Sequence, residues 1–294
     1  KFEVSKNVAP DNAPVLFDEE VASSHGKLAI IDEEGVTFTS HLDGTLHRFT
    51  PERSIEIQQK IGADMIFAFD ECTSPVAPHE YQKEAMDRTH RWAKRSLSAH
   101  RQNTKGTQQA LFGIVQGGRF EDLRKESATE LASMDFDGYG IGGSFSKEDL
   151  HAALGVTAEI LPEEKPRHLL GIGEPSDLLT GIEKGMDLFD CVAPTRNARG
   201  GSLYTKNGSI NIGGTVYQDD LTPVDEGCGC FTCVRYPKAY LAHLYRAKEM
   251  TFATLASVHN IYFIVHLVKK ARAAIMDGNF EKFKEDFLRE YYHK

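Results

Sequence analysis

The chain has 294 residues, of which 40% are hydrophobic and 26% are charged. This composition is ordinary for a globular protein and excludes a disordered chain, a collagen-like repeat and a coiled coil. No apolar run nears the roughly 18–20 residues of a membrane span, and no leader sequence follows Lys1, so we expect a soluble protein without a membrane partner. The net charge of −9 argues against indiscriminate coating of nucleic acid.

The N-terminal part predicts a small sheet followed by a capped helix. Residues 1–20 are expected to be irregular, and residues 27–49 alternate as three short strands separated by turn sequences, which predicts an antiparallel meander. Thr50-Pro51-Glu52 then begins a helix with a capping hydroxyl, a proline in the first turn and an acid near its positive end. Gly62 is expected to end it.

Five apolar runs and four amphipathic stretches follow in alternation. The runs lie at 65–70, 111–118, 138–143, 168–173 and 188–194, and helices are expected at 79–102, 119–134, 147–160 and 176–185. This order predicts parallel strands buried on both faces. Because no Gly-rich nucleotide-binding fingerprint is present, the repeat favours a (β/α)8 TIM-type barrel over a doubly wound open sheet. A Gly-rich strand pair and helices at 235–248, 250–276 and 279–291 come after residue 200.

Three of the five cysteines lie within six residues, at Cys228, Cys230 and Cys233. Such clustering indicates a reduced, cytoplasmic protein with a metal site rather than a disulfide framework. Soft thiolates favour zinc, and a structural zinc site needs four ligands. His259, 26 positions after Cys233, is preferred as the fourth ligand, with His243 and His266 as alternatives. The competing interpretation is a set of thiols that bind no metal.

Functional side chains follow several of the predicted strands, at the end where barrel enzymes build their sites. A carboxylate at Asp190 can attack an acetal-like carbon. Asp70 and Gln116 can read the polar edge of a heterocycle, and Gly142-Gly143 lets the backbone approach a flat ligand. A basic strip includes Arg196 and Arg199, which would bring phosphates or base edges beside Asp190. Ordinary polar caps on strand ends and a solvated helix face are the alternative interpretations.

From about Gly35 to the C-terminus the motifs GVTFTSHLDG, AFDECT, LFGIVQGG, FDCVAPTRNARGG and Cys-x-Cys-x2-Cys with a distant His resemble, in order, the queuosine-type tRNA-guanine transglycosylases. The resemblance implies that Asp190 attacks C1′ of guanosine 34 in the anticodon stem-loop of tRNA. Guanine leaves, a covalent tRNA–enzyme intermediate forms, and a 7-deazaguanine, the queuosine precursor preQ1, displaces the enzyme. It also implies a homodimer.

The resemblance assigns three further sets of residues. The base pocket is implied to consist of Asp70, Cys72, Gln116, Gly142, Gly143 and Leu170. The tRNA-binding residues are implied to be Gly171, Ile172, Gly173, Glu174, Pro175, Ser176, Asp177, Thr195, Arg196, Asn197, Ala198 and Arg199. One structural zinc ion per chain is implied at Cys228, Cys230, Cys233 and His259. The domains expected are a partial barrel with its meander (1–200), a zinc-binding subdomain (201–260) and helices completing the barrel (261–294).

Two departures from the family pattern concern the substrate site. The Asp-Ser-Gly-Gly-Phe-Gln motif with the general acid/base is absent, so we expect it, with the first barrel strands, upstream of residue 1 and the chain as written to be incomplete. Ser144-Phe145-Ser146 replaces a small apolar stretch that faces the aminomethyl group of preQ1. Cys72 resembles the bacterial, preQ1-using form. The alternatives are a queuine-using form, a non-catalytic tRNA-binding subunit, and a zinc hydrolase, whose ligands would lie at strand ends.

Overall fold

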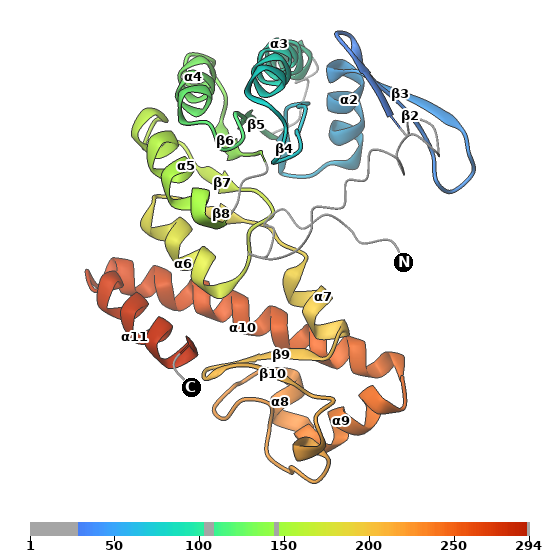
Figure 1. Cartoon of the computed structure of the whole chain (residues 1–294), viewed down its shortest axis with the longest axis vertical. Helices are drawn as coiled ribbons and strands as arrows, with labels where there is room; N and C mark the ends of the chain where they lie inside the picture. Colours follow the sequence, from blue (N-terminus) through green and yellow to red (C-terminus); the bar gives the residue numbers. More distant parts are fainter. Residues whose placement is uncertain (1–28, 103–108, 144–146, 293–294) are drawn as a thin grey trace. The chain divides into compact units, whose positions relative to one another are not determined.

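The computed structural model describes residues 29–102, 109–143 and 147–292, in two compact units (Figure 1). Unit 1 comprises described residues 29–170 and 184–188, and unit 2 comprises 171–183 and 189–292. The irregular segment expected at 1–20 and the departure at Ser144-Phe145-Ser146 lie outside the described residues.

Unit 1 begins with the predicted meander. Its three antiparallel strands pair in the order β1 (Ala29–Asp32), β2 (Gly35–Thr39) and β3 (Leu46–Phe49). Helix α2 (Pro51–Ile61) follows, and Thr50 Oγ1 accepts a hydrogen bond from Arg53 N at 3.2 Å. Gly62 ends the helix in the left-handed conformation, with φ 79°. Both ends of this helix were therefore predicted correctly from the local chemistry.

The centre of unit 1 is a curled parallel sheet. Its strands lie in the order β4 (Met65–Phe67), β5 (Ala110–Val115), β6 (Gly138–Ile141), β7 (Arg167–Leu169) and β8 (Leu188–Phe189). The intervening helices are α3 (His79–Gln102), α4 (Glu121–Ala132) and α5 (Lys147–Ile160). With α2 they form an arc outside the strands (Figure 1). Within the described residues this is a half-barrel with helices on its outer face, which does not match a doubly wound sheet.

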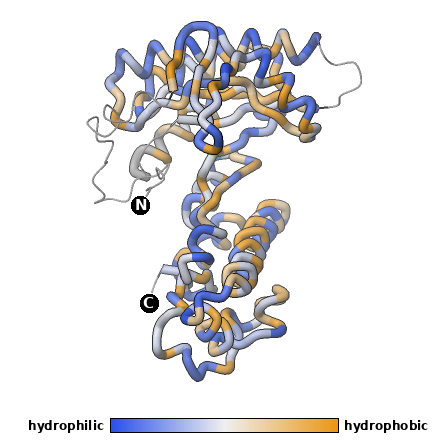
Figure 2. Tube along the Cα trace, turned by 90° about the vertical axis from the view of Figure 1, so that its right-hand side faces the viewer, coloured by the Kyte–Doolittle hydropathy of each residue, from blue (hydrophilic) through white to orange (hydrophobic). Residues whose placement is uncertain are grey.

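Burial explains why these residues form this layer. β5 is almost entirely buried, as expected for a strand covered on both faces, whereas the helices change between hydrophobic and hydrophilic from turn to turn (Figure 2). Trp92 of α3 is fully buried and stacks on Phe69, with ring centroids 4.9 Å apart. This contact fixes the chain just before Asp70, where β4 has ended.

Unit 2 contains a hairpin and six helices among its described residues. The predicted strand pair is β9 (Ser202–Thr205) and β10 (Gly208–Asn211), antiparallel. The helices are α6 (Pro175–Glu183), α7 (Ala193–Arg199), α8 (Phe231–Arg235), α9 (Lys238–Arg246), α10 (Met250–Met276) and α11 (Phe280–Tyr292), with a 3-10 turn at Thr215–Tyr217.

The limits of α4, α6 and α11 differ from the predicted ones by one or two residues, and larger differences occur at two prolines. The run at 188–194 forms a strand only at β8, and α7 starts at Ala193 because Pro194 suits the first turn of a helix. The helix expected at 235–248 is shorter and corresponds to α9, which begins only at Lys238. Pro237 forces the preceding Tyr236 into an extended conformation and so separates α9 from α8, which ends at Arg235. The domain boundary expected after residue 260 falls inside α10.

Helix α10 corrects one exclusion made from the sequence. Its residues 250–268 contain no Asp, Glu, Lys or Arg, and the helix is long and apolar enough to cross a membrane by length and composition. In unit 2 it packs against α6 to α9, α11 and β9. Two consecutive polar residues in its middle, His259 and Asn260, are fully buried. These contacts identify α10 as the central packing helix of unit 2.

Candidate active site and metal centre

The ends of β4 and β5 bring Asp70 and Gln116 together. Gln116 directly follows β5, and its Nε2 donates a hydrogen bond to Asp70 Oδ2 at 2.6 Å. Burial raises the pKa of Asp70 to about 6, the hydrogen bond from Gln116 opposes this, and the neighbouring Glu71 carboxylate adds to it. Asp70 therefore changes its protonation state close to neutral pH, so its ability to accept two hydrogen bonds depends on pH.

Gly142 and Gly143, at the end of β6, lie against the same amide. A Cβ on Gly142 would be 2.6 Å from Ile114 Cγ2 and 3.0 Å from Gln116 Nε2. Gly143 has φ +86°, and a Cβ there would be 3.1 Å from Gln116 Oε1. Only glycine fits both positions. Leu170 packs beside Gly140 of β6, and Cys72 is exposed, so the base-pocket residues predicted in unit 1 follow neighbouring strands at one edge of the sheet.

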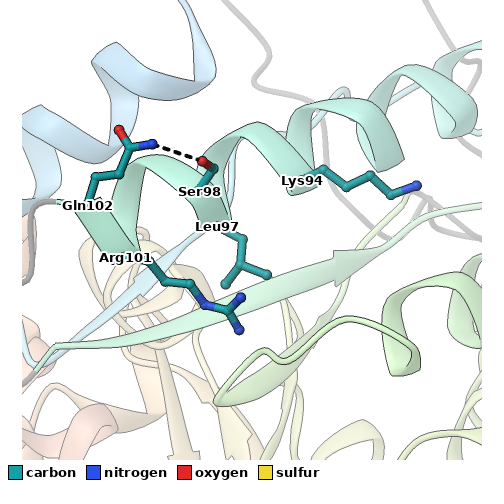
Figure 3. A pocket seen from close by; sticks show the side chains of 5 residues that line it. All are labelled: Lys94, Leu97, Ser98, Arg101 and Gln102. Carbon is teal, nitrogen blue, oxygen red and sulfur yellow. Dashed lines mark hydrogen bonds between the residues drawn. The ribbon is translucent and has the colours of Figure 1, made fainter.

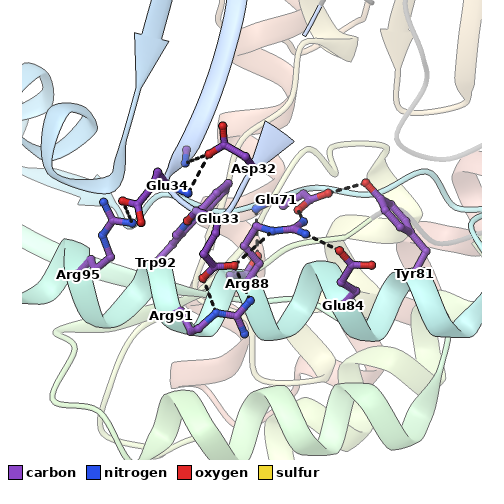
Figure 4. A network of polar contacts seen from close by, with 12 residues as sticks. Asp32, Glu33, Glu34, Glu71, Tyr81, Glu84, Arg88, Arg91, Trp92 and Arg95 are labelled. Carbon is purple, nitrogen blue, oxygen red and sulfur yellow. Dashed lines mark hydrogen bonds and ion pairs between the residues drawn. The ribbon is translucent and has the colours of Figure 1, made fainter. Parts of the chain in front are cut away.

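Helix α3 holds the segment that carries Asp70, a role that the sequence did not reveal. Ser96 Oγ accepts a hydrogen bond from Phe69 N at 3.1 Å, and Thr89 Oγ1 accepts one from Glu71 N at 3.0 Å. The Glu71 carboxylate is buried, forms an ion pair with Arg88 and accepts a hydrogen bond from the Tyr81 hydroxyl at 2.7 Å (Figure 4). The backbone on both sides of Asp70 is thus fixed by one helix.

We expect Arg88→Met to destabilise the protein by about 3 kcal/mol, because a buried Glu71 carboxylate would lose its cation. In the double variant Arg88→Met/Glu71→Gln most of this loss should be recovered. Arg91→Met is the matched control: Arg91 is one turn further along α3 and pairs with Glu33 at 2.5 Å, but both side chains are half-exposed, so its loss should cost below about 1 kcal/mol. Urea unfolding measures all three. A double variant no more stable than the single one would contradict the ion-pair explanation.

A shallow pocket on the outer side of α3 lies away from this chemistry. It is lined by Lys94, Leu97, Ser98, Arg101 and Gln102, and Gln102 Nε2 donates to Ser98 Oγ at 3.2 Å (Figure 3). Its two cations already pair with acids, Lys94 with Glu130 and Arg101 with Asp135. These residues come from the C-terminal half of α3, which runs back to the opposite edge of a parallel sheet. We assign no function to it.

Asp190 belongs to unit 2 and follows β8 directly. Its carboxylate is exposed, and Oδ1 accepts a hydrogen bond from Gly171 N at 3.1 Å. A Cβ on Gly173 would be 2.2 Å from Cys191 Cβ, so the stretch that begins at Gly171 lies directly against the segment after Asp190. The predicted attacking group and the first predicted tRNA-binding stretch are therefore neighbours in space.

The second predicted tRNA-binding stretch, 195–199, forms most of α7. Arg196 and Arg199 are exposed on it. Asn197 Nδ2 donates to Tyr204 Oη at 3.1 Å and to Glu174 Oε1 at 3.4 Å, which joins the two stretches. Several residues of these stretches are buried and support the surface from below: Ile172, Gly173, Pro175, Asp177 and Ala198. Within these two stretches, the basic groups available to a polyanion are thus Arg196 and Arg199.

The four predicted metal ligands come together in unit 2. The ligand atoms of Cys228, Cys230, Cys233 and His259 lie within 4.8 Å of one another. The three sulfur atoms are 3.3 to 3.9 Å from His259 Nδ1, and His259 Nε2 donates to Tyr204 O at 2.6 Å. This second hydrogen bond fixes the ring so that Nδ1 faces the thiols. Three sulfurs and one imidazole at this spacing can hold a metal ion, and the choice of His259 from spacing is confirmed by the geometry.

Asn260, next to the histidine ligand, is a structural residue that the sequence did not indicate. Its side chain is fully buried, accepts a hydrogen bond from Tyr204 N at 3.1 Å, and donates to Pro194 O and Ser202 O at 3.0 Å each. Consecutive residues of α10 therefore contact the metal cluster and the first turn of α7. The position of the two exposed arginines is tied to the metal centre through two side chains.

Comparisons with known proteins agree with this geometry. The family model for queuine tRNA-ribosyltransferase matches residues 7–293. The queuine tRNA-ribosyltransferase of Caldanaerobacter subterraneus subsp. tengcongensis is 47% identical over 272 residues, which are 92% of this chain and 72% of that protein. The enzyme of that name from Thermoanaerobacter sp. is 47% identical over 274 residues, with the same coverage. The one from Streptococcus gordonii is 47% identical over 264 residues, 89% of this chain and 69% of that protein.

Proposed function

The chain belongs to the queuine tRNA-ribosyltransferase family, the tRNA-guanine transglycosylases, and we propose that it exchanges guanine 34 in the anticodon of tRNA for preQ1. The observation that carries this proposal is the Asp190 carboxylate, oriented by the Gly171 amide and followed closely in the chain by α7 with its exposed arginines. A binding subunit would have no use for an accessible carboxylate held in this way.

We propose a double displacement at C1′ of nucleotide 34. Asp190 forms a bond to C1′ through a carboxylate oxygen, and guanine leaves with the electron pair of the broken C1′–N9 bond and takes up a proton. PreQ1 then gives up the proton of its five-membered ring, its ring nitrogen bonds to C1′, and the carboxylate is released. The hydrogen bond from Gly171 N to Oδ1 orients this carboxylate.

The base is proposed to bind at the strand ends of unit 1. The Asp70 carboxylate would accept hydrogen bonds from the N–H groups of the pyrimidine ring, and the Gln116 amide and the Gly142–Gly143 backbone would bind its carbonyl edge. Cys72 and Leu170 are proposed to line the pocket. In the free protein Gln116 Nε2 already donates a hydrogen bond to Asp70 Oδ2. A base that binds to Asp70 must therefore share this acceptor or replace the hydrogen bond.

The raised pKa of Asp70 makes base binding depend on pH. Since the ionised carboxylate is the acceptor, we expect the affinity for guanine to rise as pH increases through about 6 and then level off. Asp70→Asn should lose this pH dependence and bind guanine about tenfold or more weakly. Titration calorimetry between pH 5 and pH 8 measures the affinity for guanine of wild type and of Asp70→Asn. An unchanged pH profile in the variant would exclude Asp70 as the titrating acceptor.

The same shift has the opposite consequence for stability. The native state holds the Asp70 proton up to about pH 6 and the unfolded chain only up to its ordinary value of 3.8. Its contribution to the free energy of unfolding is therefore present below pH 4 and is lost as pH rises through 6. Asparagine does not titrate, so the free energy of unfolding of Asp70→Asn minus that of wild type should increase by about 1–3 kcal/mol from pH 4 to pH 8. Urea unfolding at the two pH values provides the comparison.

The tRNA is proposed to bind over α7 and the stretch that starts at Gly171. Arg199→Ala should raise KM for tRNA about tenfold, leave kcat within about twofold, and reduce the salt dependence of binding by about one phosphate contact. Arg289→Ala removes the same charge from an exposed site on α11 in the same unit and should change neither constant. Equal effects of the two variants would indicate a general charge effect instead of a contact.

We propose that the ion held by the cysteine cluster is zinc, one per chain. Thiolate and imidazole are ligands that zinc prefers, and four protein ligands leave no open position for a substrate. The ion would supply a cross-link between α8 and α10. For the full-length protein we further propose a cytoplasmic homodimer whose parallel sheet is part of a (β/α)8 barrel. The exposed apolar side chains Phe231, Val234 and Tyr240 offer an interface, and light scattering at micromolar concentration tests it.

The direct test is base exchange by the full-length protein. Labelled guanine should enter a transcript with a G34-U35 anticodon, and addition of preQ1 should release it. Queuine in place of preQ1 in the chase distinguishes the queuine-using form. Binding of the transcript without any exchange would favour a non-catalytic tRNA-binding subunit and would overturn the proposal.

A further inference from the structure

The buried face of α4 carries a cation close to the strand ends that none of the steps above uses. Arg124 is fully buried. Its Nε donates to Gly118 O at 2.7 Å, and its Nη1 donates to Gly142 O at 2.7 Å and to Val115 O at 3.4 Å. Val115 and Gly118 stand on either side of the turn that follows β5, and Gly142 follows β6. One side chain thus joins the two strand ends on which Gln116 and the glycine pair lie.

The glycine pair is held from two sides at this point. A Cβ on Gly143 would be 2.7 Å from Arg124 Nη2, so the backbone of Gly143 lies against the guanidinium. Gly142 N donates to Val115 O at 3.0 Å, while Gly142 O accepts from Arg124. The amide and the carbonyl of Gly142 are therefore both fixed, and with them the direction in which the Gly142–Gly143 peptide faces.

The choice of arginine is informative because burying a charge is costly. When a well-packed apolar side chain of similar volume replaces a buried ionic group, the protein is usually as stable as before or more stable. Desolvation lowers the pKa of Arg124 to about 10, and the group is still a cation at neutral pH. Only the planar fork of arginine offers donors in fixed directions to several carbonyls at once, whereas lysine is a single point charge. Packing alone does not explain this residue.

We propose that Arg124 is a positioning residue for base recognition, which holds the Gly142–Gly143 backbone against Gln116 so that the pocket is formed before a base enters. The proposal rests on the proposed function, because it takes these strand ends as the base pocket. A preformed pocket binds more tightly since no ordering is required on binding. Arg124 touches no base itself and acts through the glycine pair.

The test compares Arg124→Lys with Arg167→Lys in the full-length protein. Arg167 is also a buried arginine of unit 1 that donates to a carbonyl, Leu161 O at 2.7 Å, but it begins β7 at the opposite edge of the sheet. Amide hydrogen exchange at Gly142 and the KM for guanine are measured. For Arg124→Lys we expect exchange at Gly142 and KM each to rise about tenfold or more, with KM for tRNA unchanged. Arg167→Lys should change neither.

The outcomes separate this proposal from the proposed function. Unchanged amide exchange at Gly142 in Arg124→Lys would overturn the positioning role, and faster exchange with an unchanged KM for guanine would overturn the role in recognition. Equal effects of Arg167→Lys would show general destabilisation and overturn both. If wild type exchanges no base, the proposed function and the recognition role fail together, while the amide exchange of Gly142 still decides the positioning. Arg124→Gln, which keeps a planar amide donor, replaces the lysine variant if that one does not fold.

Discussion

Asp190→Asn is expected to abolish base exchange, with a loss of about a thousandfold or more, because the amide is not a nucleophile while the carboxylate is the group proposed to bond to C1′. The substitution keeps the size of the side chain and an oxygen for the hydrogen bond from Gly171 N, which is 3.1 Å from Oδ1 in the wild type. The pocket geometry should therefore be retained. Affinity for tRNA should stay within about threefold, since the electrostatic attraction is proposed to come from the arginines of α7.

Detection of the covalent protein–tRNA intermediate on a denaturing gel provides the second measurement. Wild type mixed with tRNA in the absence of preQ1 should give a covalent protein–tRNA band, and Asp190→Asn should give none. Asp219→Asn is the matched control, because it removes the same charge from an exposed position in unit 2 and should leave both exchange and the band intact. Exchange at the wild-type rate in Asp190→Asn would refute its role as nucleophile.

The regular part of the fold could be predicted from the sequence because its signals are local. The strands β4 to β7 lie within the predicted apolar runs, apart from one residue at the start of β5 and one at the start of β7, and α3, α5 and α10 have the predicted limits. Periodicity encodes which residues face the sheet, and turn chemistry encodes the ends of α2. Errors arose at α7 and at Tyr236, where a proline either starts a helix or interrupts one, and the apolar pattern alone cannot distinguish these cases.

The residues of the candidate site also fall into those that could be predicted from local sequence signals and those that could not. The metal ligands and the groups at strand ends were predictable because their residue types are rare in such patterns. Arg124, Glu71 and Asn260 were not, since a buried polar residue is defined by partners that are distant in sequence. Asn260 donates a hydrogen bond to Pro194 O, 66 positions earlier, and Arg124 donates to carbonyls that follow two different strands. In isolation Arg124 and Asn260 are ordinary polar residues of a helix, and Glu71 is an ordinary acid of a loop.

Removal of the metal is expected to disrupt unit 2 and to affect the reaction only through that loss. The helix α8 has five residues, too short to be stable alone, and two of the thiols are buried. Without the ion these groups would lose their ligand bonds and stay desolvated. We expect Cys230→Ser to hold less than one metal ion per chain and to melt about 10 °C or more below wild type. Cys191→Ser, a cysteine of unit 2 outside the cluster, should keep one ion per chain.

The structural role predicts how this loss reaches tRNA binding. His259 holds Tyr204 O and Asn260 holds Pro194 O, so disorder at the cluster releases the first turn of α7. Metal-depleted protein that is still folded at low temperature should therefore show a raised KM for tRNA before its affinity for guanine changes, because the residues proposed to bind the base belong to unit 1. Substitution of the proposed zinc by cobalt should leave kcat within about twofold, since no step of the proposed exchange uses the ion. A kcat that follows the identity of the metal, at unchanged melting temperature, would instead place the ion in the chemistry and contradict the structural assignment.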